Sequence, residues 1–217
     1  MTARALATKV LAQIVREHKT IKTAFAGLTP ENMSQRDRAF AQELVYGVCR
    51  WYFDLEQMLN QRLKKPLRAK DRDIHCLLLV GLYQLIHLDT PQHAVVKETV
   101  AVNKDLNKHW AKGLVNGCLR SAIRAHSDEN WNAENAIALN QPPWLKAKIQ
   151  TDWPQQCQSV LAAYCQRPPL SVRVNLSRIS RVDYLELLAD ADIEACALAH
   201  APSAVRIKNP QPMMTLP

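Results

Sequence analysis

The chain has 217 residues, 47% of them hydrophobic, and a formal net charge of +8 at pH 7. This length is enough for one large or two small domains with a buried core, and the apolar fraction is ordinary for a globular protein. No run approaches the 18 consecutive apolar residues of a membrane span, and the N-terminus lacks the layout of a signal peptide, so neither a membrane partner nor export is expected.

The N-terminal part is expected to consist of helices with short connections. Apolar residues recur at helical spacing over 2–17, and a short helix is expected over 21–28. Ser34 is a candidate N-cap for the segment 34–63. Because that segment is too long for one ordinary globular helix, it predicts a break near Trp51–Leu55.

The next segments predict a basic loop between helices and a very apolar helix. The loop covers 63–72 and contains Pro66, and the run from 72 to 88 predicts the central buried helix. Thr90-Pro91 is expected to begin the helix that follows. Short connections between helices are typical of a single helical bundle.

The stretch KGLVNGCLRSAIR, residues 112–124, predicts a helix with two glycines on its basic side. Gly113 and Gly117 fall opposite the apolar stripe, in register with Arg120 and Arg124. Each glycine inside a helix costs roughly 1 kcal/mol relative to alanine. Two interpretations are open: a neighbouring helix packs into the glycine groove, or the absence of side chains lets phosphates approach the backbone.

The pattern changes after residue 126. The polar segment 125–144 predicts a linker or a peripheral helix, and short helices are expected at 143–152 and 154–165. Strict alternation of apolar and polar residues over 170–176 predicts a half-buried strand. A helix and a further strand are then expected at 181–190 and 204–207. The fold class is therefore mainly α, a helical bundle followed by a small α+β segment.

The positive charge is placed unevenly along the chain. All of the net charge lies in residues 1–128, and the remainder is neutral. A basic region of this kind indicates nucleic acid as a partner, with a merely solvated basic surface as the alternative. The densest cluster lies around the interhelical loop and predicts phosphate contacts. Its members are Arg62, Lys64, Lys65, Arg68, Lys70 and Arg72.

Two further groups of residues are candidates for nucleic-acid contact. Lys112, Arg120 and Arg124 form the basic face of the glycine-containing helix. Arg173 and Asn175 share one face of the predicted strand, which suits binding of a phosphate or a base edge. An exposed strand face without a ligand is the alternative for this second group.

Glycine and cysteine argue against a catalytic or cofactor site. None of the five glycines occurs in the last 100 residues, and the chain contains neither G-x-G-x-x-G nor G-x-x-x-x-G-K-[ST]. The six cysteines lack C-x-x-C spacing, which predicts reduced, buried thiols in a cytoplasmic protein and no zinc site. We therefore expect no catalytic, cofactor-binding or metal-binding residue in this chain.

Four segments resemble the RsmB/Sun/Fmu family of bacterial 16S ribosomal RNA cytosine-C5 methyltransferases. They are DRAFAQELVYGVCRW (37–51), LLLVGLYQLIHLDTPQHAVVKETV (77–100), KGLVNGCLR (112–120) and QRPPLSVRVNLSR (166–178). The first three are also similar to the NusB antitermination factor. A NusB protein would end near residue 140 and lack the R-P-P segment, so the combination favours the methyltransferase family.

The resemblance implies a domain plan and a function. It implies a NusB-like RNA-binding domain over 1–127, a helical linker region over 128–165, and over 166–217 the start of a small α+β domain that precedes the methyltransferase core. The family's S-adenosylmethionine loop and catalytic cysteines lie beyond these segments. The chain is thus expected to hold 16S ribosomal RNA, to be inactive in methyl transfer alone, and to have the missing C-terminal catalytic domain as a partner. A free-standing NusB-like module in transcription regulation is the alternative.

Overall fold

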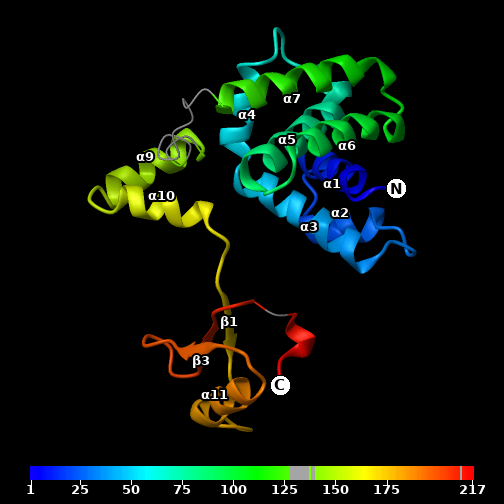
Figure 1. Cartoon of the computed structure of the whole chain (residues 1–217). Coiled ribbons are helices and arrows are strands. Elements are labelled where there is room, and N and C mark those ends of the chain that lie inside the picture. The colour runs from blue at the N-terminus through cyan, green and yellow to red at the C-terminus, as the bar shows by residue number, and fades with distance from the viewer. Residues whose placement is uncertain (128–136, 138–139, 211) are drawn as a thin grey trace. The chain divides into compact units, whose positions relative to one another are not determined.

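The computed structural model describes residues 1–127, 137, 140–210 and 212–217, and it divides into two compact units, 1–165 and 166–217. The first unit is helical, and the second contains a three-stranded sheet (Figure 1). The fold is therefore mainly α with a small α+β segment, as predicted. Among the described residues, no helix is both long and apolar enough to cross a membrane.

The first unit begins with helices that follow the predicted boundaries closely. The hydroxyl oxygens of Thr2, Thr20 and Ser34 cap α1, α2 and α3 by accepting hydrogen bonds from backbone N–H groups three residues ahead. The polar linker predicted for 125–144 lies mostly outside the described residues. The helices are α1 (Ala3–Glu17), α2 (Ile21–Leu28), α3 (Gln35–Arg50), α4 (Tyr52–Asn60), α5 (Arg72–His87), α6 (Gln92–Asp105), α7 (Lys112–Ser127), α9 (Pro143–Asp152) and α10 (Cys157–Cys165), with single 3-10 turns η1 (Ala69–Asp71) and η2 (His109–Ala111).

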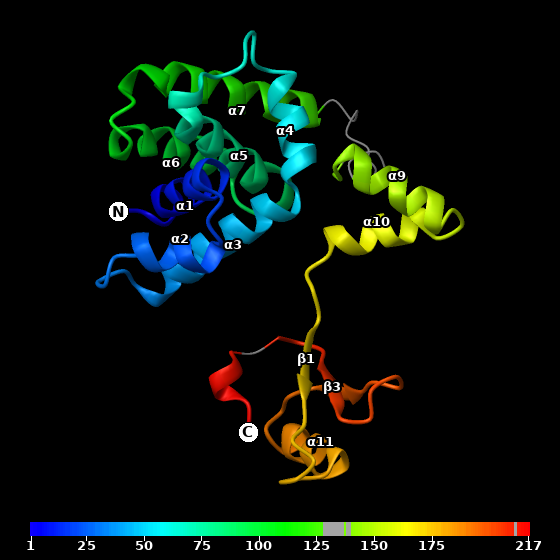
Figure 2. The same ribbon diagram turned by 180° about the vertical axis from the view of Figure 1, so that it is seen from behind.

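Helix α5 forms the centre of the bundle. Every residue from Ile74 to Gln84 is buried, and α5 contacts α1, α3, α4, α6 and α7 (Figures 1 and 2). The prediction of a central buried helix is confirmed. A Cβ atom added at Gly81 would lie 2.7 Å from Cδ2 of Leu119, so this glycine is what lets α7 pack closely on α5.

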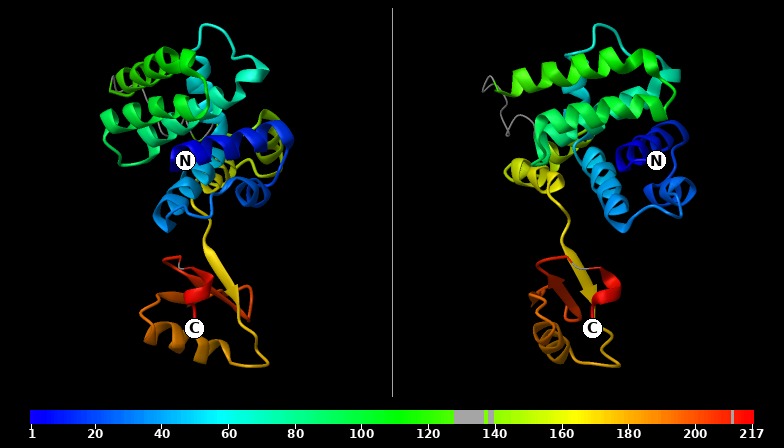
Figure 3. Two further views of the ribbon diagram at one scale, coloured as in Figure 1. Left: turned by 90° about the vertical axis from the view of Figure 1, so that its right-hand side faces the viewer. Right: turned by 45° about the vertical axis from the view of Figure 1, so that its right-hand side comes forward.

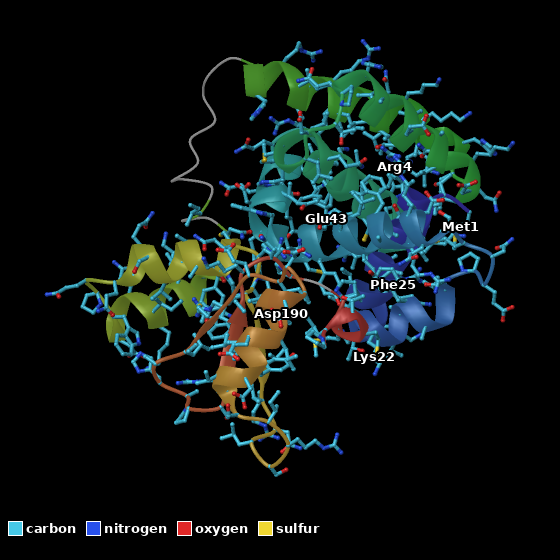
Figure 4. All side chains as sticks on the ribbon, turned by 60° about the horizontal axis from the view of Figure 1, so that its bottom comes forward. Met1, Arg4, Lys22, Phe25, Glu43 and Asp190 are labelled. Atoms are coloured by element: carbon cyan, nitrogen blue, oxygen red, sulfur yellow. The ribbon has the colours of Figure 1, made fainter. Side chains whose placement is uncertain are left out.

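The predicted break in the segment 34–63 falls at Trp51, which ends α3 and precedes α4. The indole ring of Trp51 stacks on the imidazole of His87, with centroids 4.2 Å apart. The Tyr83 ring also stacks on His87, at 5.4 Å, and its hydroxyl donates a 2.7 Å hydrogen bond to Oε1 of Glu43, which Figure 4 labels on α3. These contacts fix the end of α5 against α3.

A buried asparagine ties the end of α10 to the α3–α4 junction. Oδ1 of Asn140 accepts a 3.3 Å hydrogen bond from the backbone N–H of Asp54. Its Nδ2 donates to the carbonyl oxygen of Arg50 at 2.6 Å and to Sγ of Cys165 at 3.4 Å. Oδ2 of Asp54 is buried and has no hydrogen-bond partner among the described residues. Burial accordingly raises the pKa of Asp54 to about 6.

Asp54 and His87 are expected to make stability depend on pH with opposite signs. Because burial raises the pKa of Asp54 from 3.8 to about 6, the folded state gains stability as pH falls through this range. Burial lowers the pKa of His87 from 6.5 to about 4, so the folded state loses stability as pH falls through nearly the same range. Asp54→Asn removes only the first contribution. Between pH 6.5 and 4, the free energy of unfolding of this variant should therefore fall more than that of the parent protein. The additional fall should be on the order of 2 kcal/mol.

Urea unfolding at four pH values between 4 and 7 measures this slope. Asp89→Asn, the same change at an exposed carboxylate, is the matched control and should keep the slope of the parent protein. Parallel profiles for Asp54→Asn and the parent would contradict the assignment of Asp54 as a carboxyl that is costly to ionise in the fold.

The described residues of the second unit form one α-helix and three antiparallel strands in the order β1-β3-β2. Figure 3 shows the first of these strands as a yellow arrow. Leu170 of β1 and Ala195 of β2 both pair with Ile207 of β3. A small core forms from Val174, Leu188 and Val205. The elements are β1 (Leu170–Arg173), α11 (Arg181–Asp190), β2 (Ala195–Ala197), β3 (Ala204–Ile207) and the 3-10 turn η3 (Met213–Thr215).

The helix and the strand expected at 181–190 and 204–207 are present with those bounds, whereas two features differ from prediction. Strand β1 ends at Arg173, and Leu176 is 55% exposed, so the predicted strand does not continue to residue 176. The reason is local, because Asn175 begins a turn in place of pairing across the sheet. Strand β2 was not predicted, since three residues are too few to show alternation.

Candidate nucleic-acid interface

The predicted basic loop leaves the bundle between α4 and α5. Helix α4 ends at Asn60, and the side chains of Leu63 and Leu67 pack against the core and anchor the loop on either side of Pro66. Two cations lie between these anchors and two follow the second anchor, and all four project into solvent. Lys64, Lys65, Arg68 and Lys70 are all exposed. The exposed part of the predicted cluster is therefore held on a loop whose base is fixed.

A lysine outside the cluster neutralises its one acid. Nζ of Lys108 donates a 2.6 Å hydrogen bond to Oδ1 of the buried Asp71 and a 3.2 Å hydrogen bond to the carbonyl oxygen of Lys70. The hydrogen bond to Asp71 raises the pKa of Lys108. Because Asp71 is paired in this way, its charge is already balanced and does not cancel the charge of the exposed cations.

Arg62 and Arg72, at the two ends of the cluster, are only partly exposed. Nη1 of Arg62 donates a 2.5 Å hydrogen bond to the carbonyl oxygen of Met58. Burial lowers the pKa of Arg62, and the thiol of Cys118 on α7 lies close enough to interact with its charge. The structure thus directs Arg62 toward α7, while the four cations between Arg62 and Arg72 face solvent.

Helix α7 exposes the predicted basic side. Lys112, Arg120 and Arg124 are exposed, and nitrogen-tipped side chains project outward from the green α7 ribbon in Figure 4. A Cβ atom added at Gly113 or Gly117 would meet no heavy atom of a described residue within 4 Å. No described helix packs into the glycine groove. The described residues therefore favour the second interpretation, in which the helix backbone at the glycines is open to an approaching phosphate.

A groove of about 540 Å³ runs between α6 and α7. Arg120, Arg124 and Lys97 supply three cations, and none of the described residues that line the groove is acidic. Nε of Arg120 donates a 3.2 Å hydrogen bond to Oδ1 of Asn116, which orients its guanidinium along the helix. The full lining is Gln92, His93, Val96, Lys97, Val100, Asn116, Arg120, Ile123 and Arg124.

The loop and α7 lie beside each other. The cyan loop arches next to α7 in Figure 1 and in the turned views of Figure 3, and the charge of Arg62 interacts with the thiol of Cys118 on α7. A hollow of about 450 Å³ near η2 brings Arg68 and Lys70 together with the 57% exposed Trp110. Trp110 was not among the predicted residues. Its position next to basic residues was the available signal, since exposed aromatic rings stack on unpaired bases.

Arg173 and Asn175 lie in the second unit. Both line a hollow of about 280 Å³. Oδ1 of Asn175 accepts hydrogen bonds from the backbone N–H and the hydroxyl of Ser177, at 3.2 and 2.7 Å. That oxygen is therefore engaged in a turn, whereas the exposed Arg173 side chain lines the same hollow.

The cysteines and the possible metal ligands are the candidates for a second site. The six cysteines are free thiols, and Cys76, Cys118 and Cys165 are buried as predicted. The prediction is wrong for Cys49 and Cys196, which are exposed because they lie on the outward faces of α3 and β2. Within the described part of the chain, no three His, Cys, Asp or Glu side chains are grouped so that they could hold a metal ion.

Comparison with known proteins assigns both units to described families. Residues 1–124 match the NusB family, and residues 141–214 match the ferredoxin-like domain of RsmF/B-like methyltransferases. The crystal structure of PH0851 superposes with a TM-score of 0.66 over 99% of this chain and 50% of that chain. The sequence identity is 12%, so this likeness concerns the fold alone.

Several curated proteins match the whole chain. A probable ribosomal RNA small subunit methyltransferase B of Coxiella burnetii is 38% identical over 100% of this chain and 50% of its own length. The ribosomal RNA small subunit methyltransferase B of Yersinia enterocolitica is 38% identical, and that of Escherichia coli is 35% identical, each over 99% of this chain and 50% of the relative. The chain spans about half the length of the curated relatives it matches.

Proposed function

The chain belongs to the NusB family, and from this premise we propose that its first unit binds 16S ribosomal RNA on behalf of a cytosine-C5 methyltransferase. The observation that carries the proposal is the basic surface formed by the loop 61–71 and the exposed side of α7. We call this surface the loop–α7 face. Its relatives named ribosomal RNA small subunit methyltransferase B support the choice of RNA.

The chemistry of the loop–α7 face suits a phosphate backbone. Lysine and arginine side chains that contact phosphates release condensed counterions, which supplies most of the sequence-independent affinity for nucleic acid. Trp110 adds an aromatic surface for an unpaired base. The second unit would add Arg173 as a further phosphate contact, and Asn175 would act by shaping the turn beside it.

The second unit favours the methyltransferase function over a free-standing NusB-like module in transcription regulation. Residues 141–214 match a domain that belongs to methyltransferases. A free-standing NusB-like module would have no need of this domain. S-adenosylmethionine is the cofactor we propose for the whole protein. The turns after β1 and β3 contain no glycine, so they do not fit its adenosine or methionine part, and no residue of this chain is assigned to it. We propose the cytoplasm, where ribosomal RNA is made in bacteria, as the compartment.

RNA binding by this chain is expected to weaken steeply with salt. The seven exposed cations of the loop and α7 would give a slope of log affinity against log salt of about −5, near −0.7 per phosphate on single strands. Between 50 and 200 mM potassium chloride, affinity for a 16S ribosomal RNA transcript should fall on the order of 1,000-fold. Fluorescence anisotropy with labelled RNA measures both quantities.

An oligomer of the same bases with an uncharged methylphosphonate backbone is the control for this titration. It should bind weakly and with little dependence on salt, because it has no counterions to release. A slope near zero for the natural RNA would overturn the proposed function.

A further inference from the structure

The groove between α6 and α7 combines an apolar floor with a basic rim. Val96 is 8% exposed and Val100 is half-buried, so both present methyl groups to the groove while their helix packs on the core. Arg120 and Arg124 lie one helical turn apart, which places the roots of their side chains about 6 Å from each other. With Lys97 on the facing helix, the cations flank the floor on both sides.

The glycines of α7 place an open path beside this groove. Gly113 and Gly117 each cost roughly 1 kcal/mol in the interior of a helix, and no contact among the described residues compensates for it. Along α7, Gly113 and Arg124 are separated by about 16 Å. A chain can therefore pass closely over bare helix backbone between the loop cations and the groove, where longer side chains would hold it away.

We propose that the α6–α7 groove binds one unpaired nucleotide of a single-stranded RNA, with its base on Val96 and Val100 and its phosphates on Arg120 and Arg124. The inference rests on the proposed RNA-binding function and adds to it a subsite that requires a base. Asn116, Gln92 and His93 at the rim offer hydrogen-bonding groups to the base edge. The volume of about 540 Å³ falls within the roughly 300–1,000 Å³ of small-ligand pockets.

The same features disfavour other occupants. A duplex would keep its bases stacked inside and leave the apolar floor empty, because unpaired bases are what proteins take into such pockets. A docked amphipathic helix needs anchors over several turns, whereas the valines of this floor cover only one turn of α6. A peptide that suited the basic rim would have to be acidic. Preferential binding of an acidic peptide would therefore contradict the nucleotide subsite, and the experiment below includes this outcome.

The test compares two RNAs of equal charge on the full chain. A 12-nucleotide oligouridylate should bind about tenfold more tightly than its abasic counterpart, which keeps every phosphate and lacks the bases. Val100→Trp fills the groove and should lower this ratio at least threefold, to the part that stacking on Trp110 supplies. Ala101→Trp adds the same side chain at an exposed position of α6 outside the groove, and it should keep the ratio of the parent protein.

Two results would overturn the inference and leave the proposed function intact. One is a ratio near one for the parent protein with salt-dependent binding of both RNAs, and the other is an unchanged ratio in Val100→Trp. Absence of RNA binding by the parent protein would instead refute the proposed function.

A second experiment applies if Val100→Trp fails to fold. RNA that contains 4-thiouridine is crosslinked to the parent protein, and crosslinks are expected in 92–100 or 116–124. Crosslinks found only elsewhere, or a tenfold preference for an acidic peptide over oligouridylate, would contradict the subsite.

Discussion

Gly47→Ala is expected to lower the free energy of unfolding by about 3 kcal/mol, because the added methyl group has no room. Its Cβ would lie 1.9 Å from Cζ of Tyr83 and 2.3 Å from the Tyr83 hydroxyl. The tyrosine has little freedom to move away, since its hydroxyl donates to Glu43 and its ring stacks on His87. Relief of the clash would break the hydrogen bond or separate α3 from α5, and either change costs stability.

Urea unfolding followed by circular dichroism measures the effect, and Gly117→Ala is the matched control. Both glycines lie inside helices, but the space around Gly117 is open. Gly117→Ala should therefore raise the free energy of unfolding by about 0.5–1 kcal/mol through helix propensity alone. Equal effects of the two substitutions would contradict the close packing of Tyr83 over α3.

Reversing three charges on the basic loop is expected to weaken RNA binding on the order of 100-fold at moderate salt. In Lys64→Glu/Lys65→Glu/Arg68→Glu, three exposed cations become repulsive to phosphate while the anchoring contact of Lys108 with Asp71 is untouched. The slope of log affinity against log salt should become shallower by about 2, because three phosphate contacts are lost. Anisotropy titrations of 16S ribosomal RNA at several salt concentrations measure both values.

The control for this variant must change the net charge by the same amount on another surface. Lys22→Glu/Arg36→Glu/Arg38→Glu does so with exposed side chains on α2 and the start of α3. Helix α2, where Figure 4 labels Lys22, lies on the far side of the bundle from α7 in Figures 1 and 2. This variant should retain most of the affinity and the slope. Equal losses in both variants would show that only the overall charge matters, which removes the loop from the site.

Local sequence patterns predicted most helices of the first unit. The apolar run from 76 to 83 indicated burial on all sides, and α5 is buried in this way from Ile74 to Gln84. Trp51 breaks the segment 34–63 as expected from its length. Such patterns work because the spacing of apolar residues is a property of consecutive residues, and it decides which side of a helix leaves water wherever its partners lie.

The candidate interface depended more on contacts between distant segments. In the sequence, Arg62 and Lys64 are equivalent candidates for phosphate contact. In the structure, the Arg62 guanidinium donates a hydrogen bond to the carbonyl oxygen of Met58, and its charge interacts with the Cys118 thiol of α7. Trp110 stands beside lysines in the sequence, but only the fold places it in a hollow with Arg68 and Lys70. Asn140 joins the α3–α4 junction to Cys165. It lies more than 80 residues from its partner Asp54 in the sequence, and periodicity does not reveal contacts between segments so far apart.

The sequence by itself determined the fold class, the basic character of residues 1–128 and the two sides of α7. Only the tertiary structure decided what each glycine does. The side chain of Tyr83 occupies the space beside Gly47, and that of Leu119 occupies the space beside Gly81. Gly113 and Gly117 face open space. The physical reason is that helical periodicity assigns a residue to a side of its own helix, while the occupation of that side depends on which other segment packs there.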